Sequence, residues 1–258
     1  MNVIGLTVRQ VRYENKSFWR NPFSAFFTFA FPLMFLVIFN LLFGHDTYRG
    51  FGPKVSTSTF YTPAIVAFSV ITACYTNIAM TVTIARDHGI LKRLRGTPLP
   101  TWGYLAGRIL HAILIAALLV VIVVAFGRVF YDVDIPTTTL PAFIVSLTVG
   151  AATFCALGVA VSGLIPNAEA APAVVNASIL PLLFISDIFI PLENAPKWLV
   201  TFSNIFPIKH FAHAILTAFN PFTKGAGFVV TDLVVMAVWC AGGLAMALRF
   251  FTWEPRMG

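Results

Sequence analysis

The sequence predicts an all-α integral membrane protein that crosses the membrane six times. Hydrophobic residues make up 58% of its 258 residues, charged residues only 10%, and 26 residues are Phe. Soluble domains have roughly half apolar and about a quarter charged residues, and a single core of this size could not bury so much apolar surface. Long apolar runs also alternate with short polar segments, and each run has the roughly 20 residues that cross a bilayer as a helix.

Six apolar runs have the required length. They cover residues 25–44, 61–84, 105–127, 141–164, 171–190 and 229–250. A proline inside a helix leaves a carbonyl without its N–H donor and usually kinks the helix. Pro32 should therefore bend the first run, and Pro172 and Pro181 interrupt the fifth. The fifth run also carries a charged residue, Asp187, near its end.

The distribution of basic residues predicts that both termini lie in the cytoplasm. With the N-terminus inside, eleven of the 17 Lys and Arg residues fall on the cytoplasmic side, where positive charge is normally enriched. This asymmetry explains the net charge of +7 without nucleic-acid binding. We therefore expect a multi-pass protein of a bacterial inner (cytoplasmic) membrane.

Residues 1–22 predict a short helix that lies flat on the inner membrane surface. Its apolar face is formed by Ile4, Val8, Val11 and Phe18, and its cationic face by Arg9, Arg12, Lys16 and Arg20. A helix with one apolar and one basic face binds in the headgroup layer. The pair Asn21-Pro22 should end it, because the residue before a proline avoids the helical conformation.

Residues 191–220, before the last run, are too apolar for an ordinary loop. Asn204, Pro207 and Lys209 break the apolar pattern, so we expect a re-entrant or interfacial helical hairpin and not a seventh span. His210 and His213 are spaced to share a metal ion, but no third ligand lies near them in sequence. A polar pair at the interface is the expected role.

Five hydroxyl residues form one stripe along the second run. They are Thr62, Ser69, Thr72, Thr76 and Thr83. The stripe has two interpretations, namely close helix–helix packing or the polar wall of a translocation cavity. In the fifth run, Asn176 and Asp187 are three helical turns apart and should share a face directed into the protein or toward water.

The sequence contains no motif for nucleotide phosphates or for catalysis. It has no Gly-x4-Gly-Lys-Ser/Thr loop, no His-Glu-x2-His and no Cys-x2-Cys. Cys74, Cys155 and Cys240 fall inside predicted spans, where buried small apolar residues are expected and not a disulfide framework. We expect a chain that binds no metal and no cofactor of its own.

Two stretches resemble the type-2 family of ABC transporter permeases. The first, ARDHGILKRLRGTPLPTWGYLAGRIL, resembles the family's cytoplasmic loop through Arg86, Asp87, Gly89, Leu91, Leu94, Thr97, Pro98, Tyr104, Gly107 and Arg108. The second, ISDIFIPLENAPKWLVTFSNIFPIKHF, is similar to its outer segment through Pro191, Glu193, Pro196, Trp198, Pro207, Lys209, His210 and Phe211. The chain departs from the family pattern at Ala85, where a glutamate is common, and at Asp187, where a glycine is common.

The resemblance implies one type-2 transmembrane domain over residues 1–258. Residues 1–22 would be its connecting helix, and about 86–97 its coupling helix, which docks on a separate ATPase. The implied coupling residues are Arg86, Asp87, Gly89, Leu91, Lys92, Arg93, Leu94, Thr97 and Pro98. The second and fifth spans would line the path, through Ser69, Thr72, Thr76, Asn176, Leu180 and Asp187.

The implied function is that of a non-catalytic membrane subunit of an ATP-driven exporter. Two copies of an ATPase, which carry ATP and Mg, would pair with two permeases, either identical or homologous, surrounded by membrane lipids. The weakly polar cavity suits a hydrophobic or amphipathic cargo such as a drug, a natural product or a lipid, and a drug cargo would mean multidrug efflux and antibiotic resistance. Alternatives are a polysaccharide or glycolipid exporter, an intramembrane lipid-modifying enzyme, or a stand-alone secondary transporter.

Overall fold

The computed structural model describes residues 3–44, 47–48, 55–94, 96, 101–192 and 195–250. Its elements, in chain order, are α1 (Val3–Trp19), α2 (Pro22–Phe43), β1 (Thr47–Tyr48), β2 (Val55–Ser56), α3 (Thr57–Ile71), the π-helical turn η1 (Thr72–Thr76), α4 (Asn77–Asp87), α5 (Ile90–Leu94), α6 (Thr101–Tyr131), α7 (Leu140–Leu164), α8 (Ala171–Phe184), α9 (Lys197–Ser203), α10 (Pro207–Phe219) and α11 (Val230–Phe250). β1 and β2 form a small antiparallel hairpin in which Thr47 pairs with Ser56, and the sequence did not predict it.

Five helices among the described residues are long and apolar enough to cross a membrane. They are Pro22–Phe43, Thr57–Asp87, Trp102–Tyr131, Leu140–Leu164 and Val230–Phe250. The second of these is one continuous helix of 31 residues made of α3, η1 and α4. The all-α membrane architecture is confirmed, together with five of the six predicted spans.

The predicted fifth span, 171–190, is wrong at its C-terminal end. Helix α8 stops at Phe184 after 14 residues, which rise about 21 Å against a hydrocarbon core of about 30 Å. Asp187 has a left-handed backbone with φ +57°, and its carboxylate accepts a hydrogen bond of 2.7 Å from the Leu192 N–H. Because the backbone at Asp187 is not helical, α8 cannot continue as a helix to residue 190.

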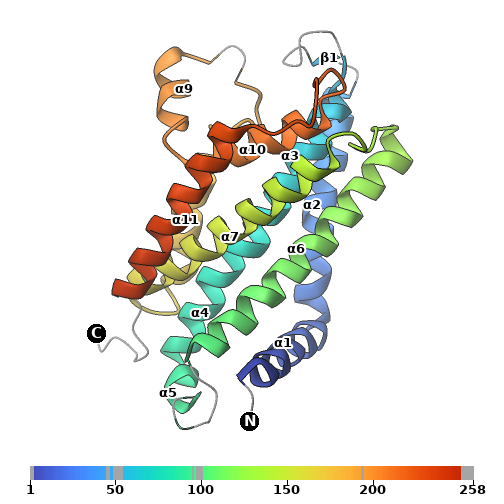
Figure 1. Ribbon diagram of the computed structural model, residues 1–258. Helices are drawn as coiled ribbons and strands as arrows, with labels where there is room; N and C mark the ends of the chain where they lie inside the picture. The colour runs from blue at the N-terminus through green and yellow to red at the C-terminus, as the bar shows by residue number, and fades with distance from the viewer. Residues whose placement is uncertain are drawn as a thin grey trace.

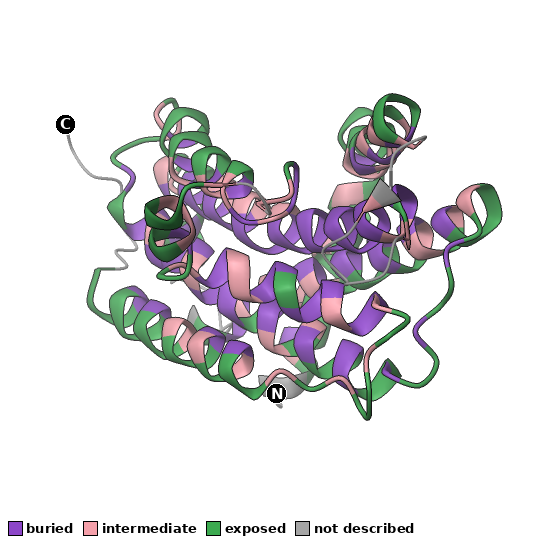
Figure 2. Cartoon of the chain, turned by 90° about the horizontal axis from the view of Figure 1, so that it is seen from above, coloured by how far each residue is buried: buried purple, intermediate pink, exposed green. Residues whose placement is uncertain are grey.

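The two ends of the bundle carry different elements (Figure 1). Helices α1 and α5 and the C-terminal end of α11 lie at one end, and β1 and α9 lie at the opposite end. The long helices run between these two ends. Figure 2 shows that buried residues gather along the middle of the bundle and that exposed residues cover its rim, as expected where the outer surfaces of the helices face lipid.

Aromatic contacts attach α2 to the rest of the bundle. Phe39 stacks on Tyr61 of α3 with ring centroids 4.9 Å apart, and Phe35 stacks on Phe189 at 5.4 Å. Such pairs add about 0.5–1.5 kcal/mol each to the apolar burial. The Phe-rich composition of α2 therefore has a structural use where the helix meets its neighbours, while Phe23 and Phe26 are exposed.

Helix α7 packs closely on the second span and on α11. A Cβ on Gly158 would lie 2.9 Å from the Tyr75 carbonyl oxygen, so only glycine permits this approach. The Thr153 hydroxyl lies 3.0 Å from the Met236 carbonyl oxygen of α11. Small and hydroxyl residues are the usual means of close helix contact in a membrane.

Most of the described part of segment 191–220 is helical, as the sequence predicts. It contains α9 and α10, and α10 packs against α3, α7 and α11. The buried face of α10 includes Ile208, Phe211, Ile215 and Phe219. In Figure 1, α10 lies at the end of the bundle opposite to α1. Its depth relative to the bilayer stays a prediction.

Candidate functional site

The turn between α4 and α5 is built around a glycine. Gly89 has φ +69°, a backbone conformation that glycine adopts without steric cost. Its N–H lies 3.0 Å from the Arg86 carbonyl oxygen, which ends α4. The chain then begins α5 at Ile90. The short helix therefore extends from the end of the bundle that also carries α1 (Figure 1).

Arg86 is buried and binds the C-terminal end of α7. It is only 1% exposed, and its guanidinium donates to the carbonyl oxygens of Ser162, at 2.8 Å, and Ile165, and more weakly to that of Pro166. The last carbonyls of a helix lack internal donors and carry partial negative charge. One arginine thus satisfies several acceptors that the end of α7 would otherwise leave without a donor.

Asp87 binds the same loop as its neighbour. Its carboxylate accepts a hydrogen bond of 2.9 Å from the Ala168 N–H. The loop between α7 and α8 is thereby fixed to the last turn of α4 through both residues. We call Arg86 and Asp87, together with loop 165–170, the α4–loop clamp.

Helix α5 has one buried anchor and an exposed surface. Leu91 is fully buried and packs with Ala85 of α4 and Tyr104 of α6. Ile90 is 44% exposed, and Lys92 and Arg93 are exposed. The anchor fixes the helix to the bundle, and the basic and apolar side chains around it remain available to a partner.

The structure divides the predicted coupling residues into groups with different surroundings. Arg86, Asp87 and Leu91 contact the chain itself, Gly89 shapes the turn, and Lys92 and Arg93 are exposed. Thr97, Pro98 and the side chain of Leu94 lie outside the described residues. Contact with an ATPase therefore stays a prediction. Among the predicted coupling residues that the structure describes, the charged side chains of Lys92 and Arg93 are exposed and could make this contact.

Helix α1 packs on α6 at a glycine. A Cβ on Gly107 would lie 2.6 Å from Gln10 Cγ. Arg108 forms a salt bridge of 3.4 Å with Glu14 of α1 and donates a 2.9 Å hydrogen bond to the Thr81 carbonyl of α4. The Arg108 guanidinium thus joins α6 both to α1 and to α4 of the second span.

The amphipathic prediction for α1 is correct for its cations and only partly correct for its apolar face. The four predicted cations, Arg9, Arg12, Lys16 and Arg20, are exposed. Val11 and Phe18 are half-buried, but Val8 is 60% exposed. The helix turns a mixed face with polar Glu14 toward α6, because Arg108 there supplies a cation. The sequence pattern of α1 alone could not predict this contact, because Arg108 belongs to another helix.

The hydroxyl stripe divides into two environments. Thr62, Ser69 and Thr83 are fully buried, and Ser69 and Thr83 donate to carbonyls one turn earlier in the same helix, at 2.7 Å. This half of the stripe serves close packing. Thr72 and Thr76 lie in η1 and face a groove beside α2.

The predicted path residues of the fifth span do not share one helical face. Asn176 and Leu180 are exposed on α8. Asp187 lies beyond the end of the helix and accepts the Leu192 N–H. The expectation for Asn176 and Asp187 is therefore wrong, because the helix ends between them. A role for these residues in translocation stays a prediction.

Sequence reasoning missed a charge cluster at the opposite end of the bundle. Asp232 of α11 is 5% exposed. Its two carboxylate oxygens lie 2.7 Å from His210 Nδ1 and 2.6 Å from His213 Nδ1. The spacing of the two histidines was visible in the sequence, but Asp232 is about 20 residues away. No group of three or more His, Cys, Asp or Glu residues in the described part of the chain is arranged to hold a metal ion.

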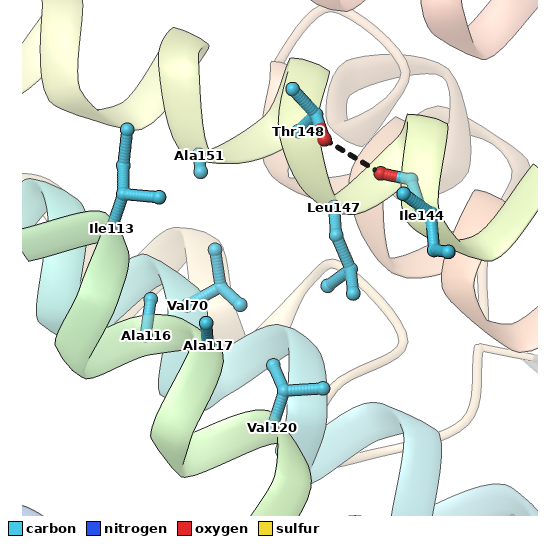
Figure 3. Close-up of a pocket in the computed structure, with 9 residues that line it drawn as sticks. All are labelled: Val70, Ile113, Ala116, Ala117, Val120, Ile144, Leu147, Thr148 and Ala151. Carbon is cyan, nitrogen blue, oxygen red and sulfur yellow. Dashed lines mark hydrogen bonds between the residues drawn. The ribbon is translucent and has the colours of Figure 1, made fainter. Parts of the chain in front are cut away.

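An apolar pocket of about 230 Å³ lies between α6 and α7 (Figure 3). Val70, Ile113, Val120 and Leu147 are among its lining residues. The hydroxyl of Thr148 points along its own helix and donates to the Ile144 carbonyl at 2.8 Å. The pocket offers no free polar group for chemistry, and its lining is that of a groove facing lipid.

The family profile described as ABC-2 type transporter matches residues 7–220, which include most of α1, the α4–α5 turn and α10. The chain belongs to the ABC-2 type transporter family. The resemblance found in the two sequence stretches is thereby confirmed, and the chain is an ABC type-2 permease.

Similar proteins carry names that agree with this family. The probable multidrug ABC transporter permease YbhR of Escherichia coli K12 is 26% identical over 161 residues, which cover 62% of this permease and 44% of YbhR. The putative transport permease ycf38 of Cyanophora paradoxa is 27% identical over 198 residues, which cover 74% of this chain and 66% of ycf38. This ABC-2 permease thus spans less than half of YbhR and about two thirds of that ycf38 protein.

Proposed function

We propose that this chain is the membrane subunit of an ATP-driven exporter that moves a hydrophobic or amphipathic compound out of the cytoplasm. Energy would come from two copies of a separate ATPase that carry ATP and Mg, so the chain itself would have no catalytic role. The observation that supports this proposal most directly is the connection from the exposed helix α5 to the start of α8 through the α4–loop clamp. The name of YbhR, a probable multidrug permease, favours a drug-like cargo.

The connection has three steps. A force on α5 acts on Leu91, which is enclosed by Ala85 and Tyr104. Movement of Ala85 is movement of α4, because the residue lies in that helix. Arg86 and Asp87 then carry the movement to loop 165–170, where α8 begins. In this way an ATPase that binds only α5 would reach a helix on the proposed path.

The arrangement of the ends supports a cytoplasmic location for both termini. Helices α1 and α5 and the C-terminal end of α11 share one end of the bundle (Figure 1). That is the side to which the sequence assigns eleven of the 17 basic residues, as the positive-inside rule requires. The chain would then lie in the bacterial inner membrane, with α9 and the β-hairpin outside.

A second copy, or a homologous permease, would complete the path. Asn176, Leu180 and Phe184 are exposed along α8, and a polar Asn on a lipid-facing surface would be costly. Pairing through this face would enclose Asn176 between two chains. A polysaccharide or glycolipid cargo is the alternative, since the same architecture would serve it.

The test is binding of the purified full-length chain to the P-loop ATPase that we expect a neighbouring reading frame to encode. The double variant Lys92→Glu/Arg93→Glu should weaken binding by at least about tenfold, because each lost surface ion pair is worth up to about 1 kcal/mol and reversal adds repulsion. The matched control Arg128→Glu/Lys224→Glu reverses two exposed charges elsewhere. Equal binding by both double variants would refute docking at α5.

A further inference from the structure

A polar cavity lies where α1, α2, α4 and α6 meet. It holds about 220 Å³ and is lined by Glu14, Ser17, Asn21, Ser24, Asn77, Thr81, Arg108 and His111, with Phe18, Ile78 and Ala112. Its residues come from the consecutive helices α1 and α2, from the link between them, and from α4 and α6 further along the chain. Neither the α4–loop clamp nor the proposed path uses it.

One side chain that lines this cavity has a buried polar atom without a protein partner. His111 is 94% buried, since only 6% of it is exposed, and its Nε2 has no hydrogen-bond partner among the described residues. A buried polar atom without a partner is costly and is rare in folded proteins. A ligand atom in the cavity that His111 lines would supply the missing hydrogen bond.

The charges of the cavity have both signs. Arg108 uses donors for Glu14, at 3.4 Å, and for the Thr81 carbonyl, but a guanidinium has five N–H donors. Glu14 accepts one further hydrogen bond, from Gln10 Nε2 at 2.8 Å. The remaining guanidinium donors suit a phosphate, and the adjacent carboxylate suits an ammonium group.

An apolar groove continues from the polar cavity. The groove holds about 200 Å³ between α2 and the second span, and it shares Phe18, Ser24 and Asn77 with the polar cavity. Phe27, Phe31, Pro32 and Ala73 supply most of its apolar surface. Phe27 and Phe31 are 60% and 44% exposed, so the groove opens to the surface of the bundle that faces the bilayer.

The π-helical turn η1 forms one wall of this groove. The Asn77 N–H bonds to the Thr72 carbonyl five residues earlier, which widens the helix at this point. Thr72 and Thr76 of the turn line the groove, and Thr76 Oγ1 is buried without a partner among the described residues. π-Helical turns occur frequently at functional sites.

We propose that the cavity and the groove together bind one phospholipid with a zwitterionic headgroup. The phosphate lies at Arg108 and His111, the ammonium lies at Glu14, and an acyl chain follows the groove along Phe27 and Phe31. The lipid comes either from the surrounding bilayer or from the cargo. Only one part of this assignment rests on the proposed function, namely the side of the membrane on which the headgroup lies.

The test uses the purified full-length chain in detergent and native mass spectrometry. Phosphatidylethanolamine should bind with one copy per chain and at least about tenfold more tightly than phosphatidylglycerol with the same acyl chains, because Glu14 repels a headgroup that lacks the ammonium. Phosphoethanolamine without acyl chains should not bind measurably, since it leaves the groove empty.

Two variants address the two parts of the site. His111→Leu removes the imidazole from the headgroup pocket and should weaken phosphatidylethanolamine binding by about tenfold or more. Ser24→Trp places a large side chain at the exposed junction of cavity and groove and should abolish binding. Thr148→Trp, also at an exposed hydroxyl residue, is the control and should bind as the parent does.

The outcomes separate the proposal from its alternatives. Equal lipid binding by the parent and Ser24→Trp, or no preference for phosphatidylethanolamine, would overturn the site. If His111→Leu fails to fold, Ser24→Trp still decides the question, because Ser24 is exposed. ATP-dependent loss of fluorescent phosphatidylethanolamine from one leaflet of vesicles that contain the complex identifies a cargo lipid, and an unchanged distribution identifies a bilayer lipid. ATPase binding is measured separately, so failure of this site leaves the proposed function intact.

Discussion

Arg86 shows how a charged residue is accommodated at the end of a membrane helix. The guanidinium is enclosed by the protein and meets the carbonyls of Ser162 and Ile165. A cation at a helix C-terminus interacts favourably with the helix dipole, and hydrogen bonds from charged donors contribute about 1.5–3 kcal/mol each. Its contribution to folding should therefore exceed that of any surface arginine.

We expect Arg86→Met to destabilise the chain by about 3 kcal/mol or more, because it leaves the carbonyls at the end of α7 without their donor. The measurement is denaturant unfolding of the purified chain in detergent. Arg128→Met is the matched control, since Arg128 forms an exposed 3.0 Å ion pair with Asp134 that should contribute at most about 1 kcal/mol. Equal losses in the two variants would contradict the role assigned to Arg86.

His213 should make the contact between α10 and α11 sensitive to pH. The hydrogen bond to Asp232 raises the pKa of His213 above its usual value of 6.5, with Asp187 acting in the same direction and burial and Lys209 opposing it. His210, on the same carboxylate, is a further titratable neighbour. Because the folded-state pKa is raised, this stabilisation is present below pH 6.5 and is lost as pH rises through the raised pKa.

The check is the melting temperature of the chain in detergent from about pH 5.5 to about pH 8.5. The parent should lose stability toward the upper end of this range, and His213→Gln should show a smaller loss. His88→Gln, at an exposed histidine on the opposite end of the bundle, should keep the parent's profile. A His213→Gln profile that matches the parent would refute the assignment.

At the scale of the element, α5 is too short to form by itself. Five residues make little more than one turn, and isolated helices of that length are unstable in water. The helix exists because Gly89 sets the direction of the chain and Leu91 is anchored between α4 and α6. The conformation of one glycine thus decides how α5 is presented.

We expect Gly89→Ala to destabilise the chain by about 1–2 kcal/mol, because a Cβ at φ +69° is strained. Apart from the adjoining backbone, no atom of the described residues lies within 4 Å of the added Cβ, so the expected effect is conformational and not steric. Gly5→Ala in α1 also meets open space and should instead stabilise by about 0.5–1 kcal/mol. Unfolding free energies of the two variants should therefore shift in opposite directions, and a shift of the same sign would contradict this account.

The elements differ in how far the sequence could predict them. The long runs on α2, α6, α7 and α11 are confirmed, because bilayer thickness sets their length and composition. Helix α8 is shorter than predicted, since it ends at Phe184 before the left-handed residue Asp187, and a non-glycine residue rarely adopts that conformation. The hydrogen bonds of Arg86 also could not be predicted from the sequence, because its partners begin some 76 residues further along the chain.

At the scale of the whole molecule, local patterns predict which end of the bundle each element occupies, but not what it touches there. The basic residues place α1 and α5 at one end, which Figure 1 confirms. Glu14 contacts Arg108, and Asp232 contacts two histidines. Each of these contacts joins two different helices, and the hydrophobic periodicity of either helix does not predict it. The candidate site was therefore predicted as a set of segments, and its hydrogen bonds were not.

The α4–loop clamp has a mechanical consequence for α8. Loop 165–170 is held at its base by Arg86 and Asp87, whereas the far end of α8 runs into an irregular turn at Asp187. If loop 165–170 moves with α4, the helix would act as a lever with a fulcrum at Ala171 and an arm of about 21 Å. A rotation of about 10° at the fulcrum would carry the far end by about 4 Å. A small displacement at the base of α8 would in this way be magnified at its far end.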